Sequence, residues 1–227
     1  SWNHLSYETR NWWDIPAVMA RWNRMVTGDP GVEYLAHLLD TRLAHLDGIR
    51  ALTVGCGTGY RELELAATGR FGRIDAIDRN AARIAHARKK LAGTGAEETV
   101  RYLIGDVCRH PLGEETYDLV IAEQSLHHFH PLDHAVRRLE QAIRPGGWLV
   151  FNEYVGPARF AWTDSQIAAV DTLLAALPES YRRQWRSGRV KRRVHRPGRL
   201  AMILWDRSEA VESDRILSLL LSLIHIS

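Results

Sequence analysis

The sequence predicts an α/β fold in which helices cover both faces of a doubly wound, mostly parallel sheet. Between residues 51 and 155, short apolar runs alternate with longer segments whose apolar residues follow helical spacing. This alternation is typical of parallel strands joined by crossover helices. The chain has 227 residues, of which 45% are hydrophobic and 25% charged, so one sizeable core of ordinary globular composition is expected.

The elements of this core are predicted in order along the chain. Five apolar runs are expected to be strands, at residues 51–55, 73–78, 100–106, 117–125 and 146–155. Three segments with helical spacing lie between them, at residues 61–69, 79–93 and 131–147. Gly69 and Gly93 end the first two helices, while Pro145 and Gly146 end the third. Right-handed crossovers then place helices on both faces of the sheet.

Two flanking segments lack this alternation. Residues 1–47 predict an N-terminal helical cap that is rich in tryptophan and interrupted by Gly-Asp-Pro. Residues 157–227 predict a helical and basic extension of the core domain, which covers 48–156. Within this extension, Thr163 or Asp164 is expected to be the N-cap of a helix.

Basic residues are concentrated in the extension. Residues 182–199 contain nine Lys or Arg and no acidic residue, although the net charge of the whole chain is only +3. We interpret this stretch as a solvated basic surface. The alternative is a contact for an anionic substrate or nucleic acid, but no recognisable nucleic-acid-binding module accompanies the charge.

The cysteines and the two ends of the chain bear on its location. Cys56 and Cys108 cannot form a disulfide framework, which favours a reducing, cytoplasmic setting. The opening residues lack an initiating Met and do not form a signal peptide. The final run, ILSLLLSLIHIS, has about half the length needed to span a bilayer. Because SLIHIS resembles translated sequencing-adapter read-through, we expect the last residues to be artefactual and the natural C-terminus to be missing.

A glycine turn follows the first predicted strand in the stretch ALTVGCGTGY, residues 51–60. The alternating Gly55, Gly57 and Gly59 indicate that something lies against the backbone, since glycine permits close approach and positive φ. A phosphate-binding P-loop needs Gly-Lys-Ser/Thr, whereas Tyr60 follows the last glycine here. The dinucleotide fingerprint GxGxxG is out of register with this GxGxG pattern. Neither phosphate motif fits.

Two acidic residues close the next two predicted strands. Asp78 ends the second strand, where a carboxylate can accept hydrogen bonds from both hydroxyls of a ribose. Asp106 closes the third strand and is placed to accept a hydrogen bond from an adenine amino group. In this sheet topology, Asp78 is expected beside the glycine turn.

These motifs, followed by YDLVIAEQSLHHF and RPGGWLVFNEY, occur in the order found in the class I S-adenosylmethionine-dependent methyltransferases, which residues 48–156 resemble. The resemblance implies a Rossmann-like fold with S-adenosylmethionine as cofactor. It also implies two closing strands, one of them antiparallel; we find no convincing pair after 156 and expect them to be truncated. The nucleoside would contact Asp78, Arg79, Asp106 and Val107. The methionine part would lie near Gly55, Cys56, Gly57, Gly59, Glu123 and Gln124.

Two of these side chains have alternative interpretations. Cys56 is expected to contribute backbone atoms and a small packing side chain, and not to act as a nucleophile. Glu123 could serve only to cap a loop.

Candidate catalytic residues follow the fourth and fifth predicted strands. In-line methyl transfer requires alignment of the acceptor and exclusion of water, and a base helps where the acceptor is a hydroxyl or an ammonium group. The candidate bases are His127, His128, Glu153 and Tyr154, because ligands bind at this edge of open α/β sheets. A histidine after this strand is often structural in the family. The acceptor is expected to be a small molecule of unidentified structure.

The histidine-rich stretch HHFHPLDH, residues 127–134, raises the question of a metal site. Pro131 interrupts helical spacing, and no partner cysteine or set of carboxylates is apparent. We therefore expect no metal.

Three alternative functions are considered. A non-catalytic methyltransferase-like scaffold would bind a partner through the flanking tryptophans and the basic stretch. A nucleotide-dependent oxidoreductase would share the glycine turn and Asp78. Nucleic-acid methylation is disfavoured, because AEQS stands where NPPY or DPPY would follow the fourth strand.

The flanks are also expected to cover the cofactor, since the core strands provide no roof over the edge of the sheet. Aromatic side chains suit this role because they exclude water and present flat apolar surface to a cation. We predict that Tyr7 or Trp12 approaches the cofactor pocket. Packing of Trp12, Trp13 and Trp22 against the sheet is the alternative.

Overall fold

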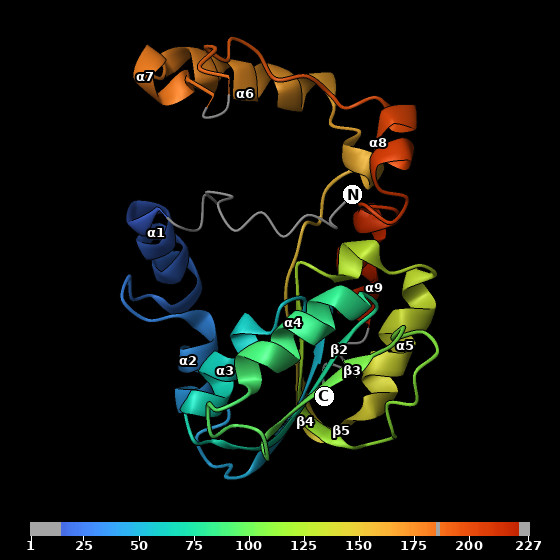
Figure 1. The fold of residues 1–227 in the computed structure, drawn as a ribbon. Helices are drawn as coiled ribbons and strands as arrows, with labels where there is room; N and C mark the ends of the chain where they lie inside the picture. The colour runs from blue at the N-terminus through green and yellow to red at the C-terminus, as the bar shows by residue number, and fades with distance from the viewer. Residues whose placement is uncertain (1–14, 185–186, 223–227) are drawn as a thin grey trace. The chain divides into compact units, whose positions relative to one another are not determined.

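The computed structural model describes residues 15–184 and 187–222 (Figure 1). The chain divides into two compact units, residues 1–49 and 50–227. The aromatic residues predicted to lie near the cofactor or on the sheet fall partly outside the described residues, namely Tyr7, Trp12 and Trp13.

The first unit contains two helices in its described part. Helix α1 (Pro16–Thr27) ends at Gly28, whose left-handed φ of 87° lets its N–H donate to the Arg24 carbonyl at 3.1 Å. The side chain of Glu33 caps α2 (Tyr34–Thr41) by accepting hydrogen bonds from two backbone N–H groups. The two helices lie on either side of the predicted Gly-Asp-Pro break, and the assignment of residues 1–47 as a cap stays a prediction.

The second unit is built on a five-stranded parallel sheet with the order β3-β2-β1-β4-β5. The strands are β1 (Ile49–Val54), β2 (Phe71–Asp78), β3 (Val100–Ile104), β4 (Tyr117–Glu123) and β5 (Ile143–Asn152). Strand β1 is central and pairs with β4, where Leu52 lies opposite Val120, and both strands are almost wholly buried. The predicted fold class is confirmed.

The connections determine which face each helix covers. Helices α3 (Tyr60–Ala67) and α4 (Ala81–Leu91) lead from β1 to β2 and from β2 to β3. Helix α5 (Leu132–Ala142) leads from β4 to β5, in the opposite direction across the sheet. Right-handed crossovers therefore put α5 on the opposite face from α3 and α4. The strand order reverses between β1 and β4, and ligands of open α/β sheets bind at the carboxyl ends of the strands there.

Helix α5 and the C-terminal helix α9 (Ile216–Ser222) contribute to the main core of this unit. The buried residues of α5 recur every three or four positions, so one face of the helix is apolar. They pack in one cluster with Leu52, Val120, Ile216 and Leu220. Burial of each such Leu or Ile side chain stabilises the fold by about 1.5–3 kcal/mol. The C-terminal segment is thus part of the same core.

The predicted bounds of the helix over 131–147 and of the strand after it are wrong. The helix expected over 131–147 ends well before its predicted end, and β5 follows it at once. Pro145 and Gly146 lie within β5, where the register against β4 shifts. Proline has no N–H to donate to the hydrogen bonds between strands. Strand β5 is therefore irregular at Pro145, whereas the sequence predicted a strand that begins after this residue. The strand also ends sooner than expected, and Glu153 and Tyr154 follow it.

The predicted capped helix in the extension is α6 (Asp164–Ala176). Thr163 is its N-cap and forms a capping box with Gln166, which confirms one of the two predicted caps. Beyond β5, no further strand joins the sheet within residues 153–184 and 187–222.

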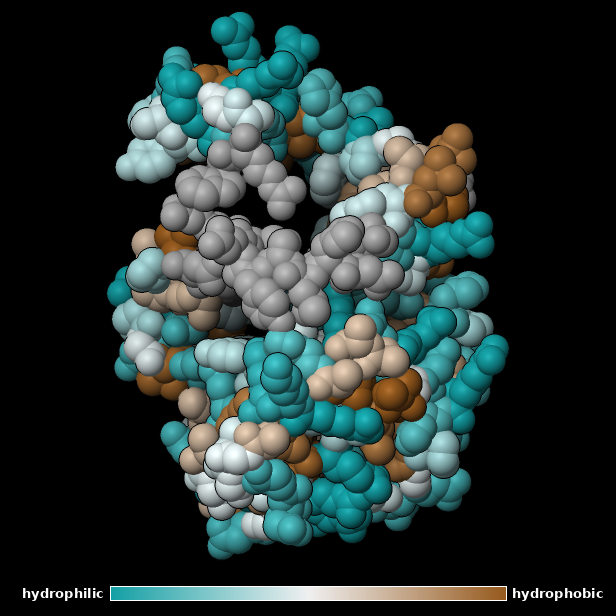
Figure 2. All heavy atoms as spheres, in the orientation of Figure 1, coloured by the Kyte–Doolittle hydropathy of each residue, from teal (hydrophilic) through white to brown (hydrophobic). Residues whose placement is uncertain are grey.

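Two short helices flank the basic stretch, α7 (Glu179–Arg182) and α8 (Arg199–Trp205). Helix α8 exposes Leu200 and Leu204, and Figure 2 shows a brown area over this helix. Among the described helices, none combines the length and the apolar composition needed to cross a membrane.

Candidate functional site

The glycine turn lies between the carboxyl end of β1 and the start of α3. Gly55, Gly57 and Gly59 all have positive φ, at 70°, 58° and 74°. A Cβ added at Gly55 would overlap the side chain of Ser125, and one at Gly59 would overlap Tyr102. A Cβ at Gly57 would meet no atom of the described residues within 4 Å. Gly55 and Gly59 therefore make room for protein side chains, and of the three glycines Gly57 is the one with open space beside it among the described residues.

Asp78 is held against this turn by the backbone. Its Oδ2 accepts the N–H of Gly57 at 2.9 Å, and its Oδ1 accepts the N–H of Asn80 at 2.8 Å. The N–H of Gly55 donates to the Ile77 carbonyl at 2.8 Å, so the turn is also bonded to the end of β2. The carboxylate is consequently fixed in place and partly accessible, and it retains lone pairs for further donors.

Asp106 lies just beyond the end of β3. Its Oδ1 accepts the N–H of Cys108 at 2.9 Å, and its Oδ2 lies 3.7 Å from Nε of Arg79, whose side chain is 70% exposed. Val107 is buried in the core next to this acid.

In the glycine turn, burial raises the pKa of the Cys56 thiol far above its usual range. Cys56 therefore stays protonated, as its predicted packing role requires.

Glu123, at the end of β4, forms a two-pronged ion pair with Arg61 of α3. The guanidinium donates through Nε to Oε2 at 2.8 Å and through Nη2 to Oε1 at 3.0 Å. The next residue, Gln124, has a positive φ of 48° and donates from its side chain to the Asn152 carbonyl at 3.0 Å. The sequence analysis did not identify Arg61 as a partner of this acid.

Glu62 is a second residue that the sequence analysis missed. It lies in the first turn of α3 and is only 1% exposed. Its Oε2 has no hydrogen-bond partner among the described residues. Burial raises the pKa of this carboxyl to about 7. Its spacing from the buried Leu65 on the same face of α3 was the available signal.

His127 and Glu153 form a close pair of side chains after β4 and β5. His127 Nδ1 lies 2.6 Å from Glu153 Oε2, and the Glu153 side chain is fully buried. Backbone N–H groups of Ser125, Leu126 and Tyr154 also donate to this carboxylate. The sequence analysis named both members, and the structure brings them together. Tyr154 points elsewhere, because its hydroxyl donates to the Pro157 carbonyl at 3.1 Å.

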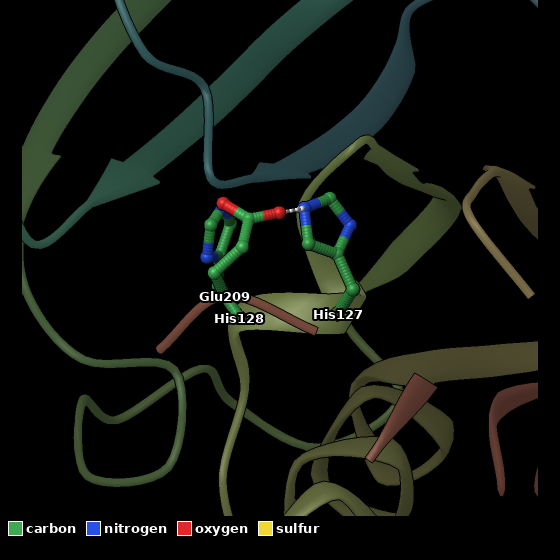
Figure 3. A group of neighbouring side chains, drawn as sticks. All are labelled: His127, His128 and Glu209. Carbon is green, nitrogen blue, oxygen red and sulfur yellow. Dashed lines mark ion pairs between the residues drawn. The ribbon is translucent and has the colours of Figure 1, made fainter. Parts of the chain in front are cut away.

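Glu209 completes this cluster from a distant part of the chain (Figure 3). Its carboxylate lies 3.6 Å from His127 Nε2 and 3.9 Å from His128 Nε2. Both Glu209 and His127 are buried, at 5% and 7% exposure. Burial and the neighbouring His127 lower the pKa of His128. No local pattern around Glu209 predicts this contact.

The loop that carries Glu209, residues 206–213, is fastened to the rest of the second unit. Arg159 donates to the carbonyls of Asp206 and Glu209 at 3.1 Å and to that of Arg207 at 2.7 Å. The N–H of Val211 donates to the His127 carbonyl at 3.3 Å. The buried carboxylate is therefore held at the end of β4 by backbone contacts as well as by its charge.

The parallel sheet with its order reversal, the glycine turn after β1, and the acids after β2 and β3 define an α/β domain of the class that binds nucleosides at the carboxyl edge. Residues 52–151 match the family model of the methyltransferase domain. This match covers just under half of the chain, and it supports a class I S-adenosylmethionine-dependent methyltransferase.

Three curated relatives illustrate the similarity. The methyltransferase GfsG of Streptomyces halstedii is 29% identical over 129 residues, which cover 56% of this chain and 44% of that protein. The malonyl-[acyl-carrier protein] O-methyltransferase of Priestia megaterium is 30% identical over 47% of this chain and 37% of its own length. The 27-O-demethylrifamycin SV methyltransferase of Amycolatopsis mediterranei is 26% identical over 48% and 39%. The chain spans less than half the length of these relatives.

Proposed function

We propose that this chain is an enzyme that transfers a methyl group from S-adenosylmethionine to a small-molecule acceptor. The observation that carries the proposal is the hydrogen bond from the Gly57 N–H to Asp78, which fixes an acid against the glycine turn at the reversal of the strand order. The match of residues 52–151 to the methyltransferase domain supports the same cofactor.

The residues at this edge fit the cofactor. The backbone of Gly57 has open space beside it among the described residues, where a ligand can approach closely. We assign the ribose hydroxyls to Asp78 and the adenine to Asp106, because charged acceptors form the stronger hydrogen bonds. When bound, S-adenosylmethionine supplies an electrophilic methyl group, since its sulfonium carries a positive charge.

The acceptor is proposed to react through a group that carries a proton, such as a hydroxyl. Two of the relatives are named for O-methylation or for an O-demethylated substrate, which supports an oxygen acceptor. His127 uses Nδ1 toward Glu153, so its Nε2 is the atom that can take up the acceptor's proton. Tyr154 is assigned a packing role, because its hydroxyl is occupied within its own loop and its ring meets Phe160 edge-on at 4.8 Å.

Calorimetry with S-adenosylmethionine, S-adenosylhomocysteine and NAD tests the cofactor assignment. We expect binding of both sulfur compounds and no binding of NAD. Binding of NAD alone would contradict the proposal and favour the oxidoreductase. A screen of small phenols, alcohols, carboxylic acids and amines with methyl-labelled cofactor then tests transfer. Cofactor binding without methylation of any acceptor would favour the non-catalytic scaffold.

A further inference from the structure

Two imidazoles and a carboxylate converge beside the candidate active site. The ligand-bearing atoms of His127, His128 and Glu209 all lie within 4.8 Å of one another, and Figure 3 shows the three side chains converging. We propose that this cluster binds a divalent first-row transition ion such as Zn²⁺. The proposal reverses the expectation from the sequence, which found no carboxylate partner for the histidines because Glu209 lies in a distant loop.

The distances suit an ion better than a hydrogen bond. His127 Nε2 to Glu209 Oε1 is 3.6 Å, and His128 Nε2 to Glu209 Oε2 is 3.9 Å. Both values exceed the ~2.7–3.2 Å of an N–H···O hydrogen bond. Ligand atoms arranged tetrahedrally at the ~2.0–2.1 Å of a Zn²⁺–N or Zn²⁺–O bond lie about 3.3 Å apart. The two N–O separations exceed this value by a few tenths of an ångström, whereas the three ligand atoms as a set lie within 4.8 Å of one another, so ion binding draws the widest-spaced pair closer by up to about 1.5 Å.

The carboxylate of Glu209 also lacks a partner that an ion would supply. The residue is 5% exposed, and its Oε2 accepts no hydrogen bond from any described residue. Buried carboxylate oxygens are normally paired or bound to a metal, because an unpartnered charge is costly to bury. A proton on His127 would serve only the oxygen nearer to that ring, whereas an ion bound by both imidazoles supplies a positive partner for the carboxylate.

The Nδ1 atoms of both imidazoles already have polar partners, as is usual for histidines in protein metal sites. His127 Nδ1 lies 2.6 Å from Glu153, and His128 Nδ1 lies 3.2 Å from the hydroxyl of Ser208. Such second contacts fix the ring orientation and leave Nε2 for the metal. Imidazole and carboxylate ligands favour zinc, iron or cobalt over calcium or magnesium. Three protein ligands also leave a fourth position for water or substrate.

The metal site and the base role of His127 use the same atom. Coordination takes the Nε2 lone pair that the proposed function assigns to the acceptor's proton, so the ion and the proton compete for it. The metal proposal itself rests on the three ligands and needs neither cofactor nor acceptor. Its test is accordingly a binding measurement, and failure of methyl transfer would leave its outcome unaffected.

Cobalt titration of the chelator-stripped 227-residue chain, without affinity-tag histidines, is the test. We expect visible absorption bands that saturate at about one Co²⁺ per chain and that added Zn²⁺ abolishes. Glu209→Gln and His128→Asn should each weaken Co²⁺ binding at least about tenfold. The matched control is His130→Asn, because His130 belongs to the same sequence motif but contacts Glu212; it should bind Co²⁺ like the parent chain.

Three outcomes would overturn the metal site. The first is the absence of saturable bands, and the second is unchanged binding in both ligand variants. The third is an equal loss in His130→Asn, which would indicate general binding to surface histidines. Circular dichroism establishes that each variant is folded, and His128→Asn provides the result if Glu209→Gln unfolds, because the His128 side chain is 29% exposed.

Discussion

Asp78 provides the sharpest test of the cofactor site at the scale of single residues. Asp78→Asn removes the charge and keeps one oxygen that can accept the Gly57 N–H. We expect the affinity for S-adenosylhomocysteine to fall by about 1–3 kcal/mol, because ribose hydroxyls would lose a charged acceptor. Calorimetry measures the loss, and Asp133→Asn, an exposed acid paired with Arg137, is the control. Unchanged affinity in the folded Asp78 variant would refute the ribose assignment.

Glu62 predicts a dependence of stability on pH. Its pKa rises from an ordinary 4.5 to about 7 in the fold, so between these values the folded chain binds more protons than the unfolded chain. The contribution of Glu62 to stability is therefore present at low pH and declines as the pH rises through this window. Relative to Glu62→Gln, the parent chain should lose about 2–3 kcal/mol of unfolding free energy between pH 4.5 and pH 8.

Urea unfolding of both proteins without cofactor, at a series of pH values, checks this expectation. Parallel stability curves for the parent and Glu62→Gln would contradict it. Glu64→Gln is the matched control, since Glu64 lies on the same helix with an exposed side chain.

Single residues differ in how far the sequence predicts them. Asp78 and Asp106 were predictable because strand ends in a parallel sheet meet at one edge, whatever the packing elsewhere. The partners of Glu123 and the burial of Glu62 were not, because both depend on how α3 lies against the sheet. The space beside each glycine likewise depends on side chains such as Ser125 and Tyr102, which are remote in sequence.

At the scale of secondary-structure elements, contacts of β2 with β3 and β4 depend on a buried carboxylate. Asp75 of β2 is 2% exposed and accepts hydrogen bonds from Arg73, from Arg101 of β3 and from the hydroxyl of Tyr117 at the start of β4. Tyr117→Phe removes one of these donors without changing the shape of the ring. We expect unfolding free energy to fall by about 1.5–3 kcal/mol, the usual value for a hydrogen bond to a charged group.

Chemical denaturation measures this loss, and Tyr181→Phe is the control because Tyr181 is 78% exposed. The control should change stability by less than about 0.5 kcal/mol. Affinity for S-adenosylhomocysteine should be the same in Tyr117→Phe as in the parent chain. A drop in affinity with no change in stability would show that Tyr117 serves the site instead of the sheet.

The order of the elements was predictable from periodicity, but one junction was not. Apolar alternation and glycine stops define where strands and helices lie along residues 51–155, and the structure confirms their sequence and parallel arrangement. At the junction of α5 and β5, Pro145 and Gly146 look like a helix stop. Pairing of Ile143 with Tyr117 places them inside a strand, and that pairing is a tertiary effect that local spacing does not reveal.

At the scale of the whole molecule, the site depends on a loop that sequence reasoning assigned only to an extension. Glu209 reaches the end of β4 because residues 206–213 are bonded to two distant segments, and α9 after them enters the core. No residue pattern near Glu209 marks it as a ligand. Its placement follows from packing between parts of the chain that are far apart, which explains why the metal cluster could not be predicted.

Arg159 connects these distant parts, and its replacement tests the arrangement. Arg159→Lys keeps the positive charge but loses the planar fork that donates to the carbonyls of Asp206, Arg207 and Glu209. We expect amide hydrogens of 206–213 to exchange faster with solvent, since the loop loses three hydrogen bonds. Exchange in β1 and β4 should be unchanged, because those strands lie in the core. Faster exchange throughout the chain would instead indicate general destabilisation. Unchanged exchange in the loop would show that the backbone hydrogen bond of Val211 and the core contacts of α9 are sufficient to hold Glu209 in place.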